Sequence, residues 1–313
     1  MVKENMNSPL AEELNSIPGA KLKIAEPLAR YTSMKIGGPA DYFIEVVHDS
    51  ALANLLRVLE LYKIDFCLLG NGSNVLISDR GVRGAVIRLA GEFKRLEWHD
   101  ENGEVHARVG AAYPVTQLVR EAARKGYAGL EFAEGIPGTV GGALFMNAGA
   151  YGSEFEKIVA RIQAMTCSGQ PLEFSRHEMR FSYRDSHLPI GTVVTRVEMR
   201  LQRSETAGVA VKVRELTQRR KSSQPSGLPN SGSMFRNPPG DFAGRLIEAA
   251  GLKGKRIGPC QISERHANFF VNLGGAKAIE VRRLMQLAQG EVKRQFGVEL
   301  VAEVKFLGEW PAE

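Results

Sequence analysis

Hydrophobic and polar positions along the first hundred residues show two patterns, one typical of strands and one typical of helices. Residues 40–47 (ADYFIEVV) are typical of a strand, and the leucines at 52, 55, 56 and 59 recur with the spacing of one helix face. We expect Asp49 or Ser50 to cap this helix. The apolar run FCLLG, the loop GNGSN at 70–74 and the strand-like runs VLIS and AVIRL follow. This order of elements predicts an α+β or an α/β fold.

The rest of the chain continues the mixture of helices and strands. Residues 114–125 predict a helix, with proline in its first turn and Gly126 beyond its end. Residues 222–233, rich in serine, proline and glycine, predict a linker, and a capped helix is expected from Asp241 to Ala250. The remaining expected elements are a strand at 192–201, helices at 210–220 and 276–296, and a closing strand at 299–307.

The length and charge of the chain narrow its class. With 313 residues, the chain is longer than one that ordinarily folds around a single hydrophobic core, which predicts two domains. The net charge of +6 and the pI near 9.2 would suit nucleic acid, but the basic residues are spread out, with one dense run at 219–221. Since small phosphorylated ligands explain this charge equally well, we expect no nucleic-acid partner.

Cysteine and histidine usage favours a reducing compartment without a metal. Cys67, Cys167 and Cys260 lie about a hundred residues apart, which argues against a disulfide framework and a cysteine metal site. The six histidines lack the spacing of a zinc site, so no metal is expected. The N-terminal residues contain no signal-peptide core, and no stretch is long enough to span a bilayer. A cytoplasmic location is the expectation.

Two glycine-rich segments stand out as candidate ligand sites. Residues 135–152 read GIPGTVGGALFMNAGAYG, and the glycines at 135, 138, 141 and 142 precede a stretch with the composition of a helix start. Unencumbered N–H groups in such turns form an anion site, so this segment and GNGSN predict a diphosphate cradle. The alternative is that each glycine only makes a surface turn. Neither segment is a Walker A sequence or a GxGxxG fingerprint, so no Rossmann site is supported.

Several ordered motifs together resemble one family. YTSMKIGGPADYFIEV, LLGNGSNVLISDRGVRGAVIRL, EGIPGTVGGALFMNAGAYG, FSYRDS, NSGSMFRNP and AEVKF are similar to the UDP-N-acetylenolpyruvoylglucosamine reductase family. The resemblance implies an α+β fold with a two-part FAD-binding domain of the vanillyl-alcohol-oxidase-like type and a C-terminal α+β substrate-binding domain. The expected boundaries are a lead-in at 1–25, the FAD-binding domain at 26–205 and the substrate-binding domain at 206–313.

The implied reaction is NADPH-dependent reduction of UDP-N-acetylglucosamine enolpyruvate to UDP-N-acetylmuramate through FAD, in peptidoglycan precursor synthesis. The partner is then a small-molecule substrate, and the oligomeric state is undetermined with a monomer favoured. An FAD oxidase of the same fold and a non-redox nucleotide-sugar binding protein are the alternatives. The FAD-binding residues that the resemblance implies are Gly70, Asn71, Gly72, Ser73, Asn74, Gly135, Ile136, Pro137, Gly138, Thr139, Gly141, Gly142 and Ala143.

The resemblance also implies the catalytic residues. Ser233 matches the proton donor, although on residue type alone a turn serine is the better interpretation. Arg184 matches the active-site arginine and suits a carboxylate, with an ion pair to Asp185 as the alternative. The alternation in ELVAEVKFL places Glu303 in mid-strand, where a half-buried carboxylate would have a raised pKa and could act as an acid, with a solvated carboxylate opposite Lys305 as the alternative. The family's catalytic glutamate lies in this closing strand.

Substrate-binding residues follow from the same motifs. Lys221 matches a lysine that contacts the UDP diphosphate, with a helix C-terminal cation as the alternative. Tyr183 and Asn237 are further substrate candidates. Only 48 residues separate Arg184 from Ser233. That interval leaves no room for the inserted loop of some members, so the chain resembles the shorter subclass, and the loop's substrate-covering tyrosine has no counterpart.

Overall fold

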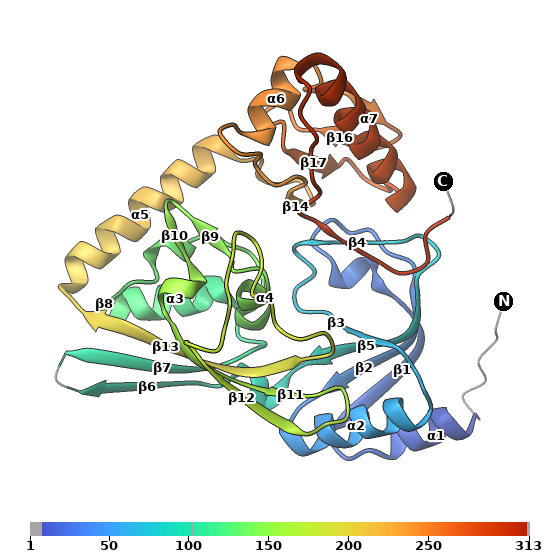
Figure 1. Cartoon of the computed structure of the whole chain (residues 1–313), viewed down its shortest axis with the longest axis vertical. Helices are drawn as coiled ribbons and strands as arrows, with labels where there is room; N and C mark the ends of the chain where they lie inside the picture. The colour runs from blue at the N-terminus through green and yellow to red at the C-terminus, as the bar shows by residue number, and fades with distance from the viewer. Residues whose placement is uncertain (1–7, 102, 312–313) are drawn as a thin grey trace. The chain divides into compact units, whose positions relative to one another are not determined.

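The computed structural model describes residues 8–101 and 103–311 (Figure 1). Packing divides the chain into two compact units, each built from several stretches of sequence. Of the described residues, unit 1 comprises 8–24, 42–70, 84–101 and 103–219, and unit 2 comprises 25–41, 71–83 and 220–311. Both units combine helices with largely antiparallel sheets, which confirms the α+β class. The domain boundaries expected from the sequence stay a prediction.

The first sheet of unit 1 has four strands and is packed against two helices. Their bounds are β1 Ala20–Pro27, β2 Pro39–Val46, β3 Phe66–Leu68, β5 Val82–Leu89, α1 Pro9–Ser16 and α2 Asp49–Leu61. The strand order is β1-β2-β5-β3. Alternation along β2 directs Tyr42, Ile44 and Val46 into a core that also receives the four leucines of α2. The strand at 40–47 and the helix after it are therefore confirmed, although His48, and neither Asp49 nor Ser50, caps the helix.

The second sheet of unit 1 is antiparallel throughout and has the main strand order β12-β11-β13-β7-β6, with β8 paired to β13. Helix α3 packs against it through a buried apolar stripe of valine, leucine and alanine. As predicted, α3 follows Pro114 and stops at Gly126, which has a φ of +72°. The bounds are β6 Leu96–Glu101, β7 Glu104–Gly110, β8 Tyr127–Ala128, β11 Val159–Met165, β12 Pro171–Ser175, β13 Val193–Arg203 and α3 Val115–Lys125.

Short elements complete unit 1 and lead out of it. They are α4 Val140–Phe145, the hairpin strands β9 Gly149–Ala150 and β10 Ser153–Glu154, α5 Thr206–Ser223, and the 3-10 helices η2 Gly91–Lys94, η3 Glu131–Ala133 and η4 Phe155–Lys157. Helix α4 begins within the glycine segment and ends at Phe145, so the helix start expected after Gly142 is wrong. Helix α5 is longer at both ends than the expected 210–220, and its last residues belong to unit 2.

In unit 2, two helices and two sheets pack around one apolar core. Its bounds are η1 Leu28–Tyr31, β4 Val75–Ile77, β14 Asn230–Ser233, α6 Ala243–Ala249, β15 Arg256–Ile257, β16 Cys260–Ile262, β17 Phe269–Asn272, α7 Ala278–Phe296 and β18 Lys305–Leu307. One sheet has the order β14-β17-β16-β15, and β18 pairs in parallel with β4. The core takes Leu76 from β4, Phe270 from β17 and the apolar faces of both helices.

Three sequence expectations for unit 2 require correction. Residues 299–304 form no continuous strand: an isolated bridge joins Ala302 to Phe235, and strand pairing begins only at Lys305 in β18. The expected linker at 222–233 ends in β14. Asp241 does not cap α6 in the expected way: Phe242 occupies the cap position, and Asn237 Oδ1 accepts from the N–H of Ala243 at 3.1 Å.

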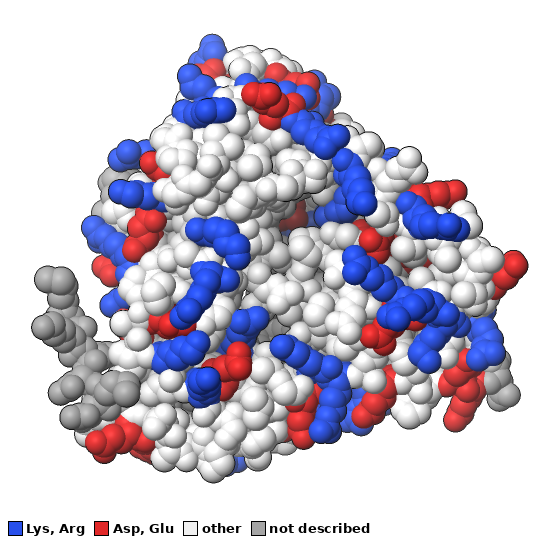
Figure 2. All heavy atoms as spheres, turned by 180° about the vertical axis from the view of Figure 1, so that it is seen from behind, with Lys and Arg blue, Asp and Glu red and all other residues white. Residues whose placement is uncertain are grey.

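The molecular surface carries mixed charge. On the face in Figure 2, Lys and Arg side chains are interspersed with Asp and Glu. Within residues 8–101 and 103–311, no helix combines the length and apolar character that crossing a membrane requires.

Candidate functional site

The loop GNGSN follows β3 and is tightly packed. An added Cβ at Gly70, in unit 1, would lie 2.7 Å from Oγ1 of Thr139, in the second glycine segment. Gly72, in unit 2, has a φ of +59°, and a Cβ there would lie 2.3 Å from the carbonyl oxygen of Tyr31. Both positions therefore require glycine for steric reasons, and at Gly72 also for its backbone conformation.

The second glycine segment turns twice through positive φ before α4. Gly135 and Gly138 have φ values of +72° and +123°, and Oγ1 of Thr139 accepts from the N–H of Gly142 at 3.3 Å. The N–H of Gly141 donates to the carbonyl of Ala111 at 2.8 Å, so this amide is already used within the protein. Thr139 is buried, whereas Gly142 is exposed.

Each of the two loops, taken by itself, offers polar groups that fit a ligand with anionic or hydroxyl groups. Among the described residues, the N–H groups of Asn71, Gly72, Gly138 and Thr139 donate to no protein acceptor. Free N–H groups at such turns bind phosphate oxygens. Directly before Gly135, Glu134 is buried; its Oε1 accepts from Thr217, but its Oε2 has no partner within the described residues. A buried acceptor of this kind needs a donor, which a bound water or a ligand hydroxyl can supply.

Arg184 lies in a tight turn of unit 1 and has an unusual backbone conformation. Ser182 and Asp185 exchange two main-chain hydrogen bonds of 2.9 and 3.1 Å across the turn. Arg184 has a φ of +60°, which costs roughly 1–3 kcal/mol for a residue other than glycine. Its Nη2 donates to the carbonyl of Gly149 at 3.2 Å, and its guanidinium lies 4.8 Å from the ring centroid of Tyr183.

Ser233 and Glu303 come together within unit 2. Ser233 ends β14, where an irregular register and a positive φ at Gly232 interrupt the pairing with β17. The N–H of Glu303 donates at 2.9 Å to the carbonyl of Met234, the residue after Ser233. Glu303 is half-buried, as expected, although its segment is not a regular strand.

The first glycine loop reaches the same segment. Nδ2 of Asn74 donates to the carbonyl of Glu303 at 3.2 Å, and the N–H of Lys305 donates to the carbonyl of Asn74 at 3.0 Å. A predicted cofactor residue and two predicted catalytic residues, Ser233 and Glu303, thus share one hydrogen-bonded framework in unit 2. Arg184 belongs to unit 1.

A cavity of about 400 Å³ in unit 2 is lined by two of the predicted residues, Ser233 and Asn237. Arg245, Arg265 and His266 also line it. Burial lowers the pKa of His266 below its ordinary value, so the ring is held toward its neutral form, and Nδ1 accepts from the N–H of Asn268. The cavity therefore offers two guanidinium groups and a neutral imidazole to a polar, anionic molecule.

Charges around this cavity are partly compensated. Arg245 forms a bidentate ion pair with Asp241, with Nε 2.7 Å from Oδ1. The hydrogen bond from Arg245 lowers the pKa of Asp241 to about 2. Arg265 has no ion pair within the described residues. Lys221 is exposed, two residues before the end of α5, so a dipole-favoured cation remains as consistent with its place as a substrate contact.

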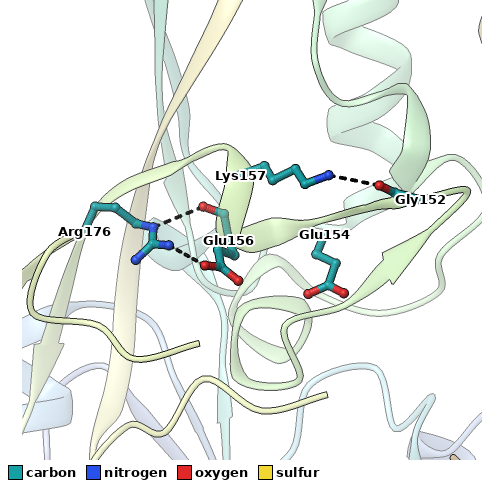
Figure 3. A pocket seen from close by; sticks show the side chains of 5 residues that line it. All are labelled: Gly152, Glu154, Glu156, Lys157 and Arg176. Atoms are coloured by element: carbon teal, nitrogen blue, oxygen red, sulfur yellow. Dashed lines mark hydrogen bonds and ion pairs between the residues drawn. The ribbon is translucent and has the colours of Figure 1, made fainter. Parts of the chain in front are cut away.

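A second cavity, of about 550 Å³, lies in unit 1 and is shown in Figure 3. Glu154, Glu156, Lys157 and Arg176 line it together with Gly152. In Figure 3, Arg176 is joined to the carboxylate and main chain of Glu156, and Lys157 donates to the carbonyl of Gly152 at 2.9 Å. Among the described residues, no group of three or more His, Cys, Asp or Glu could hold a metal ion.

Sequence reasoning missed several residues of these sites. Arg245, Arg265 and His266 follow the predicted serine motif, but their spacing carries no signal because they meet only after β14, α6 and β17 pack. Sequence reasoning also did not single out Asn147, a residue of the second glycine segment with an unusual backbone conformation. Asparagine next to Ala-Gly in the glycine segment could have indicated a positive φ, and its φ is in fact +39°.

Comparisons with known proteins agree with this arrangement. Residues 40–175 match a family model described as an FAD binding domain. Residues 224–307 match the model of the UDP-N-acetylenolpyruvoylglucosamine reductase C-terminal domain. UDP-N-acetylenolpyruvoylglucosamine reductase 2 of Symbiobacterium thermophilum is 46% identical over 97% of this chain and 98% of its own length. The reductase of Rubrobacter xylanophilus is 45% identical over 92% and 95%.

A solved structure is similar over nearly its whole length. The crystal structure of UDP-N-acetylenolpyruvylglucosamine reductase from Thermus caldophilus has a TM-score of 0.80 and 37% identity, covering 92% of this chain and 99% of that one. The fold and the glycine loops, together with the match of residues 40–175 to the FAD binding domain model, define an FAD-dependent oxidoreductase. The chain belongs to the UDP-N-acetylenolpyruvoylglucosamine reductase family. The family and the FAD cofactor that the sequence motifs implied are confirmed.

Proposed function

We propose that this chain reduces UDP-N-acetylglucosamine enolpyruvate to UDP-N-acetylmuramate with NADPH, and that Arg184, Ser233 and Glu303 act on the substrate. Family membership supports the reaction. The observation that carries the residue roles is that Ser233 lines a cavity beside arginines while the next residue, Met234, accepts from the N–H of Glu303. We further propose that the enzyme acts in the cytoplasm as a monomer.

The glycine loops would hold the cofactor. The free N–H groups of Gly138 and Thr139, in unit 1, would bind its diphosphate, and Oε2 of Glu134, in the same unit, would accept from one of its hydroxyl groups. Bound FAD supplies the hydride, which originates from NADPH. The other predicted cofactor residues shape these turns. Gly141 is needed because a Cβ there would lie 2.9 Å from that of Ala111.

The protein residues then act on the charge that the hydride creates. Hydride addition to the β-carbon of the enolpyruvyl group forms a C–H bond and moves the C=C electron pair onto the α-carbon and its carboxylate. The guanidinium of Arg184 would bind this carboxylate, and Glu303 in its acid form would donate to the enolate oxygen. Ser233 would give its hydroxyl proton to the α-carbon and regain one from solvent. One hydride and one proton are thereby added.

The unit 2 cavity would take the nucleotide-sugar part of the substrate. Arg245 and Arg265 offer donors to its phosphates, and Asn237 is placed beside them at the start of α6. Tyr183, whose ring packs against the guanidinium of Arg184, and Lys221 are proposed as further substrate contacts. Binding energy from these remote groups would orient the enolpyruvyl end for reaction.

An anaerobic colour test separates this reaction from its alternatives. The purified protein should be yellow, NADPH should bleach it, and UDP-N-acetylglucosamine enolpyruvate should restore the colour without oxygen. Recovery of colour only in air would indicate an oxidase. A colourless protein that releases no flavin on heating would indicate a non-redox nucleotide-sugar binding protein.

A further inference from the structure

We propose that Asn147 is a positioning residue for Arg184. Asn147 would hold the 182–185 turn against the end of helix α4 and thereby fix where the guanidinium meets the substrate carboxylate. The inference rests on the proposed role of Arg184. It concerns a side chain that is fully buried and does not line either cavity.

Three hydrogen bonds surround the Asn147 side chain. Nδ2 donates to Oε2 of Glu154 at 2.5 Å and to the carbonyl of Ser182 at 3.1 Å, while Oδ1 accepts from the N–H of Glu156 at 3.0 Å. A carboxylate and a carbonyl can only accept and an N–H can only donate, so the three partners fix the orientation of the amide. The bond to Ser182 joins Asn147 to the first residue of the Arg184 turn.

The other side of the turn is attached to the same helix. Ser186, which is buried, donates from its N–H and its Oγ to the carbonyl of Phe145, at 3.2 and 3.1 Å. Arg184 itself donates to Gly149, two residues after Asn147. The turn is therefore anchored on both flanks to residues 145–149. Helix α4 begins at the glycine segment, so one short helix connects the proposed cofactor loop with the arginine.

Asparagine is the residue type that this position requires. The site needs two donors and one acceptor on a short side chain, at a φ of +39° that asparagine adopts more readily than most residues. Aspartate has the same shape but donates to neither Ser182 nor Glu154, and its charge would face the Glu154 carboxylate. Because the site is buried, each lost partner leaves an unsatisfied polar group.

The test separates positioning from simple stabilisation. Asn147→Asp removes both donors. Adding Glu154→Gln supplies an amide that can donate to the carboxylate introduced at position 147, so the double variant repairs that contact and leaves only the Ser182 carbonyl without its donor. Asn54→Asp, on an exposed position of α2, is the matched control for the same change of charge. Arg184→Lys is measured beside them.

Four quantities are measured on the FAD-loaded proteins. They are the melting temperature, the rate of bleaching by NADPH, the anaerobic rate of reoxidation by the enolpyruvyl substrate, and the dissociation constant of UDP-N-acetylmuramate. Amide hydrogen exchange of a peptide covering 181–188 reports the order of the turn without turnover. Misplacing a catalytic group by about 1 Å can slow a reaction on the order of 100-fold, so a loss of at least about tenfold is the threshold.

We expect the double variant to melt between the single variant and the parent and to bleach within about twofold of the parent rate, yet to reoxidise at least about tenfold more slowly, with faster exchange at 181–188. If the single variant does not fold, the double variant carries the test. Recovery of the reoxidation rate together with the melting temperature would mean that Asn147 only stabilises the fold, and the inference fails. If Arg184→Lys reoxidises normally, the proposed role of Arg184 fails and the inference with it.

Discussion

The side chain of Thr139 fills the space where Gly70 would carry a Cβ atom. An added Cβ would lie 2.7 Å from Oγ1 of Thr139, which also accepts the N–H of Gly142. Gly70 and Thr139, which lie about seventy residues apart in sequence, are therefore packed so closely in unit 1 that no space remains between them for a further atom. Any side chain at position 70 must displace the hydroxyl that caps α4.

Gly70→Ala should weaken FAD binding. Overpacking of this kind costs about 1–3 kcal/mol, which corresponds to a rise of roughly 5- to 150-fold in the FAD dissociation constant when the cost falls on the FAD-bound state. The measurement is the ratio of flavin to protein absorbance after dialysis, followed by titration with FAD. Gly208→Ala in helix α5 is the control, because no atom lies within 4 Å of its added Cβ. The control should keep its FAD and gain up to about 1 kcal/mol of stability. Full flavin retention in Gly70→Ala would show that the loop has room.

Ser233→Ala should separate the two half-reactions. The variant should bleach with NADPH at the parent rate but reoxidise with the enolpyruvyl substrate about 100-fold or more slowly, because positioned proton transfer typically contributes roughly 10²–10⁴-fold. Ser231→Ala is the matched control on the same strand, since its buried hydroxyl donates to the carbonyl of Val75. It should lose some stability and reoxidise normally. A parent-like reoxidation rate in Ser233→Ala would remove the serine from its role.

The buried imidazole of His266 should make stability fall in mild acid. Its pKa in the folded protein is lowered from the ordinary 6.5 mainly by burial. As the pH falls below about 6.5, His266 therefore becomes protonated in the unfolded chain while it stays neutral in the folded chain. The stabilising contribution is complete above pH 6.5 and is lost as the pH falls through the folded-state pKa. His266→Gln should flatten the fall in melting temperature between about pH 7 and 5. An unchanged slope in this variant would assign the acid sensitivity to other groups.

The three cysteines should react with alkylating reagents at very different rates. Cys167 is exposed, whereas burial raises the pKa of Cys67 to about 11 and that of Cys260 to about 12. The thiolate is the reactive form, so at about pH 8 iodoacetamide should modify Cys167 first and the other two at least about tenfold more slowly. Mass spectrometry of tryptic peptides reads the order, and all three should react in denaturant. Rapid labelling of Cys260 in the folded enzyme would contradict its burial.

Local patterns predicted the helices that carry strong signals. The leucine spacing of α2 and the proline and glycine that flank α3 correspond to the observed elements because both helices bury one apolar face against a sheet. The motifs also identified the family and its FAD cofactor. These features depend on residues close in sequence, which is where single-chain reasoning is strongest.

Features that depend on distant partners were predicted less well. Alternation at 299–307 suggested one strand, but residues 301–303 bond to residues 234–236 and to Asn74, and regular pairing begins only at Lys305. The N–H of Ala243 in α6 is bound by Asn237, which lies six residues earlier across a turn that the bond from the N–H of Asp241 to the carbonyl of Pro238 closes, so the residue next to the helix does not reveal it. Asn147 has no sequence signal of its own beyond a tolerated positive φ.

Strand β18, near the end of the chain, is paired with β4, which is supplied by residues 75–77. A gene fragment beginning at residue 220 would therefore encode β18 without its neighbour and would leave the core of unit 2 open where Leu76 belongs. Such a fragment should be insoluble or aggregate through the bare edge. Exchange of this portion between relatives would succeed only when the stretches at 25–41 and 71–83 are transplanted with it, so these three pieces of sequence are expected to evolve as one.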